Sequence, residues 1–179
     1  DKDVSLSKIY RYLDKLSDNQ HKIVQDISVL HTKKILGGHI SVLFYDLTTL
    51  YFEADYEDEL RKTGFSKEGR HQNPQIILGL LVSIGGYPLA YCIHEGNKYE
   101  GHTMLPVVTE FVRKYELEDF IVVADSGLMN NDNIADLEAN GYKYIIGAKI
   151  KNESRMIQEW ILEQPKTDCQ MVEYDKSNG

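Results

Sequence analysis

The chain has 179 residues, of which 42% are hydrophobic and 27% charged, as in an ordinary globular domain with a sizeable core. Its longest apolar stretch, residues 76–84, is too short to cross a bilayer, and Cys92 and Cys169 lack the spacing of a paired motif, so we expect a cytoplasmic protein without membrane contact. The net charge of −8 argues at face value against nucleic acid as a partner, but the acids are clustered and do not exclude it.

The first part of the chain has the periodicity of helices. Apolar residues recur at three- to four-residue spacing over residues 5–36, on both sides of a break at Ser17, Asp18 and Asn19. Gly37 and Gly38 end this pattern. We therefore expect residues 1–38 to form an N-terminal helical segment, with the main domain beginning at residue 39.

The main domain is expected to alternate between strands and helices. Strands are expected near residues 40–46, 75–84, 88–94, 120–125 and 142–148, and helices over about 103–115, 131–140 and 154–163. The resulting order, β-β-β-α-β-α-β-α, predicts an α/β fold with a mixed sheet flanked by helices. The polar tail, residues 164–179, is expected to start a further insertion or a downstream part of the protein.

Two carboxylates stand out because each follows an apolar run. Asp46 comes after residues 40–45, and Asp125 comes after residues 120–124. A buried charge is costly unless it is paired or holds a cation. If the two strands are neighbours, the side chains converge and supply half of a site for a hard cation. The alternative, which these residues alone leave open, is that both carboxylates cap the turns that follow them.

Two loops carry further candidate groups. Residues 64–70 form a glycine-flanked basic loop in which Lys67 and Arg70 are suited to holding phosphates, although a solvated loop explains the same residues. Residues 94–102 contain carboxylates and imidazoles, but their spacing fits no zinc pattern and favours a polar connection. The chain has no phosphate-binding glycine loop and no serine-nucleophile motif.

In order and spacing, five short segments resemble those of DDE-type insertion-sequence transposases of bacteria. The segments are DLTTLYFE at 46–53, GFSKEGR at 64–70, GYPL at 86–89, GN at 96–97 and VADSGL at 123–128. The resemblance covers essentially the whole chain. It implies a ribonuclease H-like fold for residues 39–163, which would form an incomplete catalytic core.

The resemblance also implies metal-dependent phosphoryl transfer on DNA. Asp46 would be the first catalytic carboxylate and Asp125 the second, and together they would hold Mg²⁺ or Mn²⁺. In such a site the transposon end is nicked, and its 3′-hydroxyl then attacks target DNA. The implied partners are transposon ends and target DNA, with a homodimer as a candidate assembly and the nucleoid as the place of action.

Further positions are carried over with departures from the family pattern. The DNA-contact candidates are Lys67, Arg70, Asn97 and Lys98. Ser126 stands where the family commonly has an Arg directly after the second Asp. One basic contact expected from the family is therefore absent at that position.

The third carboxylate of the family is a Glu in a Tyr-x2-Arg-x3-Glu-x6-Lys signature on a later helix. Arg155, Glu159 and Lys166 match the last three positions, but Asn152 stands at the Tyr position and Pro165 interrupts the helix. Glu159 is one candidate for this role. The other is a Glu downstream of the sequence, in which case the isolated chain lacks a complete active site.

Two other functions remain open from the sequence. A phosphatase of the haloacid dehalogenase type would use Asp46 as nucleophile, Lys149 as phosphate-binding base and Asp125 on Mg²⁺, but that family has an Asp where Thr48 stands. A non-catalytic remnant would serve as a binding or dimerisation module. The acidic balance and the unassigned third carboxylate favour the remnant over the phosphatase.

Overall fold

The computed structural model describes residues 4–17, 20–65, 69–128, 130–164 and 172. Two compact units make up the chain, Asp1–Gly147 and Ala148–Gly179. Among the described residues, no helix is both long enough and apolar enough to span a membrane.

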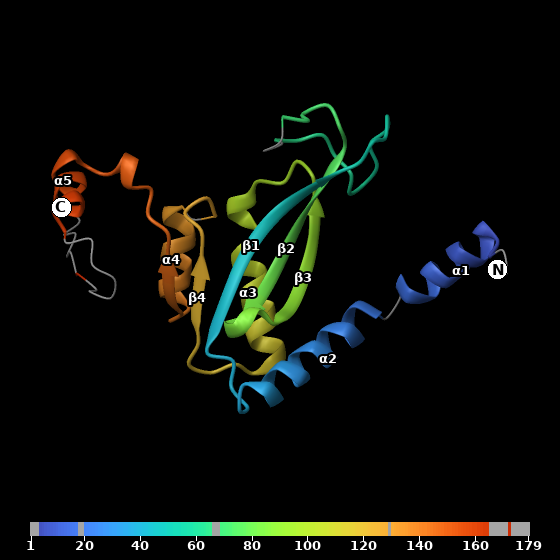
Figure 1. Ribbon diagram of the computed structural model, residues 1–179, viewed down its shortest axis with the longest axis horizontal. Helices are drawn as coiled ribbons and strands as arrows, with labels where there is room; N and C mark the ends of the chain where they lie inside the picture. The colour runs from blue at the N-terminus through green and yellow to red at the C-terminus, as the bar shows by residue number, and fades with distance from the viewer. Residues whose placement is uncertain (1–3, 18–19, 66–68, 129, 165–171, 173–179) are drawn as a thin grey trace. The chain divides into compact units, whose positions relative to one another are not determined.

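The larger unit is built around a five-stranded sheet in the order β3-β2-β1-β4-β5. Figure 1 labels the first four of these strands. The strands are β1 (Val42–Tyr51), β2 (Gln75–Ser83), β3 (Pro88–Glu95), β4 (Ile121–Ala124) and β5 (Lys143–Ile146). β2 is antiparallel to both of its neighbours, whereas β1, β4 and β5 are mutually parallel. The predicted mixed sheet and its element order are confirmed.

Helices supply the other elements of this unit. They are α1 (Leu6–Ser17), α2 (Gln20–Ile35), α3 (Met104–Tyr115) and α4 (Asn131–Ala139), with short 3₁₀ turns at Ile84–Gly86 and Glu100–His102. The predicted N-terminal helices are confirmed, although the break at residues 18–19 lies outside the described residues. Gly37 has a φ of 75°, and the N–H of Gly38 bonds to the Lys33 carbonyl, so glycines end α2 as expected.

The core lies against one face of the sheet. Alternating residues of β1 are buried, as Leu43, Tyr45 and Leu47 show, and they join Val108 of α3 and Leu137 of α4 in one cluster. Phe44, on the opposite face of β1, is 42% exposed. The sheet therefore has one face in the core and one exposed apolar face.

β1 is longer than its predicted range, residues 40–46. It continues to Tyr51 because β2 pairs with it along its whole length, down to the pair formed by Tyr51 and Gln75. Thr48 and Thr49, which the sequence suggested as residues beyond the strand, have β-branched side chains that suit this extension. Asp46 consequently lies in the middle of β1 and not at its end.

The smaller unit contains a 3₁₀ turn, Ile150–Asn152, and helix α5 (Arg155–Glu163). The Ser154 hydroxyl accepts a hydrogen bond from the Ile157 N–H and so caps the helix, which confirms the prediction for residues 154–163. Pro165, Lys166 and nearly all of the predicted tail lie outside the described residues, as does Cys169. Cys92, in the larger unit, is a free thiol.

Candidate active site

Asp46 and Asp125 occupy neighbouring positions on adjacent parallel strands. The pairing of β1 with β4 ends at Tyr45 and Ala124, and the two aspartates are the next residue on each strand. Because Tyr45 and Ala124 point into the core, the alternation of side chains places both aspartates on the opposite face. The two strands are neighbours in the sheet, which is the condition that the sequence analysis set for the two carboxylates to converge.

The surroundings of the pair differ from the prediction in one respect. Both aspartates are exposed, so the expected burial of their charges is wrong. The Gly127 N–H donates to Asp125 Oδ1, which confirms that Asp125 caps the turn after β4. The Leu47 N–H donates to Asp46 Oδ1 over 2.8 Å. These backbone bonds orient the carboxylates without preventing them from binding a ligand.

The two aspartates lie at a step in the sheet, where one strand ends before its neighbour. β4 ends at Ala124, whereas β1 continues through Tyr51, and among the described residues no strand pairs with the extension of β1 on the β4 side. Ser126 lies at this step, because a Cβ placed on Gly147 after β5 would be 3.3 Å from the Ser126 nitrogen. The step leaves the carboxylates accessible from beyond the end of β4.

The donor chemistry of the pair fits a hard divalent cation. Carboxylate oxygens, supplemented by water and phosphate oxygens, are the ligands that Mg²⁺ and Mn²⁺ take. In the part of the chain that the structure describes, no group of three or more His, Cys, Asp or Glu side chains is placed to hold a metal ion. Asp46 and Asp125 would by themselves supply only two of the donors that such a cation takes.

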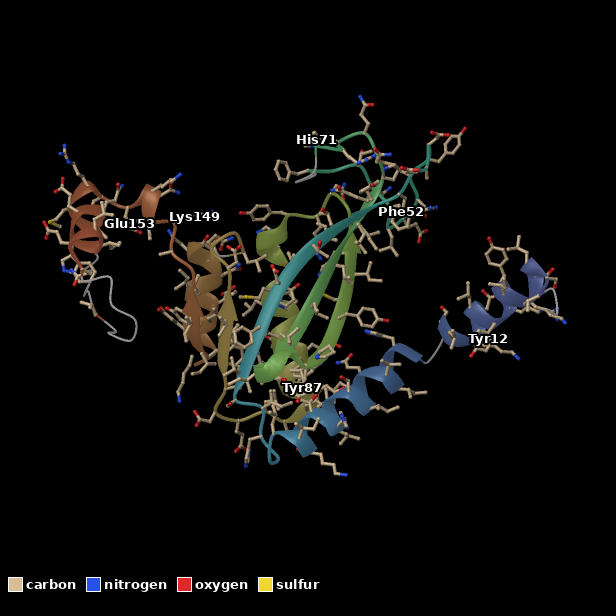
Figure 2. All side chains as sticks on the ribbon, viewed as in Figure 1. Tyr12, Phe52, His71, Tyr87, Lys149 and Glu153 are labelled. Carbon is tan, nitrogen blue, oxygen red and sulfur yellow. The ribbon has the colours of Figure 1, made fainter. Side chains whose placement is uncertain are left out.

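The predicted DNA-contact residues lie at the end of the sheet where β1 ends. The Arg70 guanidinium lies 4.5 Å from the centre of the Tyr51 ring, which is a cation–π contact. Asn97 and Lys98 are exposed in the turn after β3. Figure 2 shows Phe52 and His71 at this same end of the sheet. Lys67 lies outside the described residues.

A buried glutamine joins the two loops that carry these groups, and sequence reasoning missed it. Gln75 is 1% exposed, and its Nε2 donates to the carbonyls of Phe65 and Gly96, each over 2.9 Å. Its only sequence signal was a polar residue at the start of the apolar strand 75–84. Gln75 holds the basic loop and the turn after β3 against the first residue of β2.

A second polar cluster lies beneath β2, on the core side. The Cys92 thiol is 3.3 Å from His94 Nε2 and 3.6 Å from the Tyr45 hydroxyl. Burial raises the pKa of Tyr45 and of Cys92, and burial together with the nearby Lys98 charge lowers the pKa of His94. All three groups are thus held neutral, which is the behaviour of a structural cluster.

Glu159 belongs to the smaller unit, in helix α5. It is exposed, and its Oε1 accepts a bond of 2.8 Å from Arg155 Nε, one helical turn earlier. The Arg and Glu of the signature therefore form an ion pair on one face of the helix. The role of Glu159 as the third carboxylate stays a prediction.

The sheet order and the flanking helices define a ribonuclease H-like α/β domain, in agreement with the fold expected from the sequence. The two aspartates lie where its first and fourth strands stop pairing. The chain belongs to the transposase DDE domain family, whose model matches residues 37–175. The resemblance to DDE transposases is thereby confirmed.

A comparison with solved structures matches the chain to transposase complexes at low sequence identity. A Mos1 transposase paired-end complex with the left transposon end is 11% identical, with a TM-score of 0.42, and the match covers 81% of this chain and 52% of that one. A piggyBac transposase synaptic complex with hairpin DNA is 15% identical, with a TM-score of 0.43 and coverages of 71% and 26%. A Mos1 mariner paired-end complex with Mn is 10% identical, with a TM-score of 0.39 and coverages of 83% and 55%.

The chain thus spans about half the length of the Mos1 transposases and about a quarter of piggyBac transposase. A search of curated protein sequences gives no significant match.

Proposed function

We propose that the chain is the catalytic part of a bacterial insertion-sequence transposase, which cleaves and transfers DNA strands at the ends of its element. The observation that carries the proposal is the position of Asp46 and Asp125 at the step between β1 and β4. Membership of the transposase DDE domain family supports it. The substrates are the transposon ends and the target DNA.

In this proposal Asp46 and Asp125 hold Mg²⁺ or Mn²⁺. The backbone N–H groups of Leu47 and Gly127 fix one oxygen of each carboxylate, which limits the reorientation needed on binding. The bound ion would activate the attacking hydroxyl and stabilise the leaving oxygen. Arg70, Asn97 and Lys98 contact the DNA backbone near the end of β1, and Lys67 adds a further contact.

The third carboxylate is proposed to be a glutamate outside this sequence, and Glu159 is the alternative. The two differ in what the isolated chain can do. With Glu159 in the site, the chain cleaves DNA by itself. With the other glutamate, it binds a metal ion through Asp46 and Asp125 and does not cleave.

The test measures metal binding and strand cleavage separately. Mn²⁺ binding is followed by water proton relaxation, and nicking is followed on a duplex that carries the terminal repeat of the element. We expect Asp46→Asn and Asp125→Asn to weaken Mn²⁺ binding and to lower nicking at least about 100-fold. Asp55→Asn, in an exposed loop, is the control and should change neither.

The outcomes separate the alternatives. Unchanged nicking in Asp46→Asn would refute the proposed role of the pair. A chain that binds Mn²⁺ through Asp46 and Asp125 without nicking assigns the third carboxylate to a glutamate outside this sequence, whereas nicking that is lost in Glu159→Gln assigns it to Glu159. A chain that neither binds Mn²⁺ nor nicks DNA is the non-catalytic binding module. Membership of the transposase DDE domain family favours the transposase and its non-catalytic remnant over the phosphatase. The phosphatase family also has an aspartate where Thr48 stands in this chain.

We also infer that the chain forms a homodimer through the N-terminal helices. α1 exposes Leu6 and Leu13 by 65% and 50%, and α2 exposes Ile23, Ile27 and Leu30 by 46%, 62% and 68%. These spacings place an apolar stripe on each helix. At roughly 50 to 100 Å² of apolar surface for each such side chain, the five side chains supply about 250–500 Å², which is about a third to two thirds of the ~800 Å² that one partner contributes to a standard interface.

Sedimentation equilibrium tests the dimer directly. The chain should dimerise at micromolar concentrations, and Ile27→Glu with Leu30→Glu should give a monomer with unchanged circular dichroism. Lys22→Glu, on the same helix but outside the stripe, is the control. A wild-type chain that stays monomeric at 100 times higher concentration would refute the inference.

A location at the nucleoid is proposed together with the DNA-bound function, and the position of a fluorescent fusion of the chain in the cell tests it.

A further inference from the structure

The turn that carries Asp125 is held by a buried asparagine that has no part in the proposed metal chemistry. Asn133 lies in the first turn of α4 and is 6% exposed. Its Nδ2 donates to the Leu128 carbonyl over 2.9 Å and also to the Gly101 carbonyl. A carboxamide nitrogen has two N–H donors, so both donors of this side chain are used.

The bond to Leu128 fixes the far end of the turn that follows β4. Residues 125–128 form this turn, in which the Leu128 N–H donates to the Asp125 carbonyl over 3.2 Å. The Gly127 N–H, one residue before Leu128, donates to Asp125 Oδ1. Leu128 is 3% exposed, whereas Asp125 is exposed. The buried end of the turn thus orients the exposed carboxylate through the main chain at Gly127.

The bond to Gly101 ties the same turn to a fixed part of the core. Gly101 lies in the 3₁₀ turn that leads into α3, and Thr103, two residues later, is 0% exposed. The Thr103 side chain is hydrogen-bonded to the Tyr45 hydroxyl, one residue before Asp46. Asn133 therefore connects the turn of one aspartate to a segment that also contacts the strand of the other.

Helix formation does not account for this asparagine. The cap of α4 is Asn130, whose Oδ1 accepts a hydrogen bond of 2.8 Å from the Asn133 N–H. The Asn133 side chain leaves its own helix and reaches carbonyls that lie five and 32 residues earlier in the chain. Asparagine is also a poorer helix former than alanine or leucine, and a buried amide is costly unless it is hydrogen-bonded. The two carbonyls that it reaches are thus the physical reason for its position.

We propose that Asn133 is a positioning residue, which holds the Asp125 carboxylate in the orientation that binds a metal ion. The inference rests on the proposed function for the metal ion. It adds a group that acts through the Leu128 main chain without touching the ion or the DNA. Groups that orient a ligand in this way contribute about 10- to 100-fold to metal affinity. Without the two bonds the turn takes up more orientations, and only a fraction of them binds the ion.

The first measurement follows the turn in the absence of metal. Asn133→Leu keeps the approximate size of the side chain and removes both donors. Hydrogen exchange of single backbone amides, resolved by nuclear magnetic resonance, is compared between this variant and the whole wild-type chain. We expect the Gly127 and Leu128 amides to exchange about 5- to 30-fold faster in Asn133→Leu, which is the effect of losing one or two hydrogen bonds.

The second measurement is Mn²⁺ affinity by water proton relaxation, at a temperature where each variant is folded. Asn133→Leu should lower the affinity at least about 10-fold. Should Asn133→Leu not fold, Asn133→Ala, which is smaller and also lacks the donors, takes its place in both measurements.

Ser83→Ala is the matched control. Ser83 is 1% exposed, and its hydroxyl is hydrogen-bonded to the Ile84 and Tyr87 carbonyls, each over 3.3 Å, beyond the other end of β2. Its replacement should lower stability in urea and leave both Mn²⁺ affinity and Gly127 exchange within about twofold of wild type.

The decisive result is a double-mutant cycle. If Asn133 acts through the carboxylate, then Asn133→Leu lowers Mn²⁺ affinity no further in an Asp125→Asn background. Additive losses of affinity, unchanged exchange at Gly127, or equal losses in Ser83→Ala would overturn the proposal.

Failure of this proposal is distinguishable from failure of the proposed function. Mn²⁺ binding that depends on Asp46 and Asp125 but not on Asn133 leaves the metal site standing and rejects the positioning role. Faster Gly127 exchange in Asn133→Leu, in a chain that binds no Mn²⁺, leaves the orientation of Asp125 by Asn133 standing and rejects metal binding by this pair.

Discussion

The Gln75 side chain is the single group whose replacement tests how the candidate site is built. It is buried at the start of β2 and donates two hydrogen bonds, to the Phe65 and Gly96 carbonyls. Its own Oε1 is buried with no hydrogen-bond partner among the described residues. The amide is thus oriented so that its N–H groups are hydrogen-bonded and its carbonyl oxygen is not.

The effect of Gln75→Leu follows from these contacts. Losing two hydrogen bonds costs about 1 kcal/mol each. Leaving the Gly96 carbonyl buried and unpaired adds about 1–3 kcal/mol, and removing the unpaired Oε1 returns a similar amount. The net loss is therefore about 2 kcal/mol, which corresponds to about 4–8 °C in Tm for a chain of this size.

Gln75→Glu separates hydrogen bonding from shape, because it has the same size and no N–H donor. At pH 7 it places a carboxylate against two carbonyl oxygens, so it should destabilise the chain more than Gln75→Leu does. Burial raises the pKa of the new carboxyl, and its neutral form can donate one bond. The stability of this variant should be greatest below about pH 4.3 and should be lost as the pH rises through the raised pKa.

Urea unfolding followed by circular dichroism measures these differences. Gln72→Leu is the matched control, since Gln72 is exposed three residues earlier. If Gln75→Leu and Gln72→Leu agree within about 0.5 kcal/mol, then the two bonds contribute nothing and the reasoning fails. A Gln75→Glu variant whose stability does not improve at low pH would refute the donor role.

Three further predictions concern the polar cluster beneath β2. A Cβ on Gly79 would lie 2.5 Å from both Cys92 Sγ and the Tyr45 hydroxyl, so Gly79→Ala should cost about 1–3 kcal/mol in urea unfolding. The pKa of His94 is lowered by burial, so its contribution to stability should be complete above about pH 6.5 and lost as the pH falls through the lowered pKa, and His94→Gln should flatten that profile. Burial raises the pKa of the Cys92 thiol, so in a Cys169→Ser background a thiol reagent at pH 8 should react more slowly with the folded chain than with the urea-unfolded chain.

The order of strands and helices could be predicted from the sequence because the local residue patterns agree with the strand pairing in the structure. Apolar runs bounded by glycines gave the strands, and helical periodicity gave the crossovers between them. The length of β1 could not be predicted in this way. Residues 47–51 mix polar and apolar side chains, of which only that of Leu47 is buried, and they form a strand because β2 pairs with them. Pairing between distant segments is not a local property.

The same distinction between local patterns and long-range contacts applies to the candidate site. Asp46 and Asp125 were found because a carboxylate after an apolar run is unusual, although the reason given for them, burial, does not hold in the structure. Gln75, which joins the loop at residues 64–70 to the turn after β3, was not found, because it is a single polar residue whose importance lies in which carbonyls it reaches.

The Arg155–Glu159 pair shows why a sequence signature alone does not settle the third carboxylate. Residues four apart lie on one face of any helix, and an exposed pair of this kind stabilises a helix by about 0.3–0.5 kcal/mol whatever the protein does. The spacing in the signature is therefore explained equally well by helix stabilisation and by catalysis. The weakness of the pair also means that it does not hold Glu159 away from a metal ion, because a carboxylate–cation contact is stronger than an exposed ion pair. What separates the two roles is whether Asp46, Asp125 and Glu159 bind one ion together, and metal affinity measured in the three variants answers that without reference to the motif.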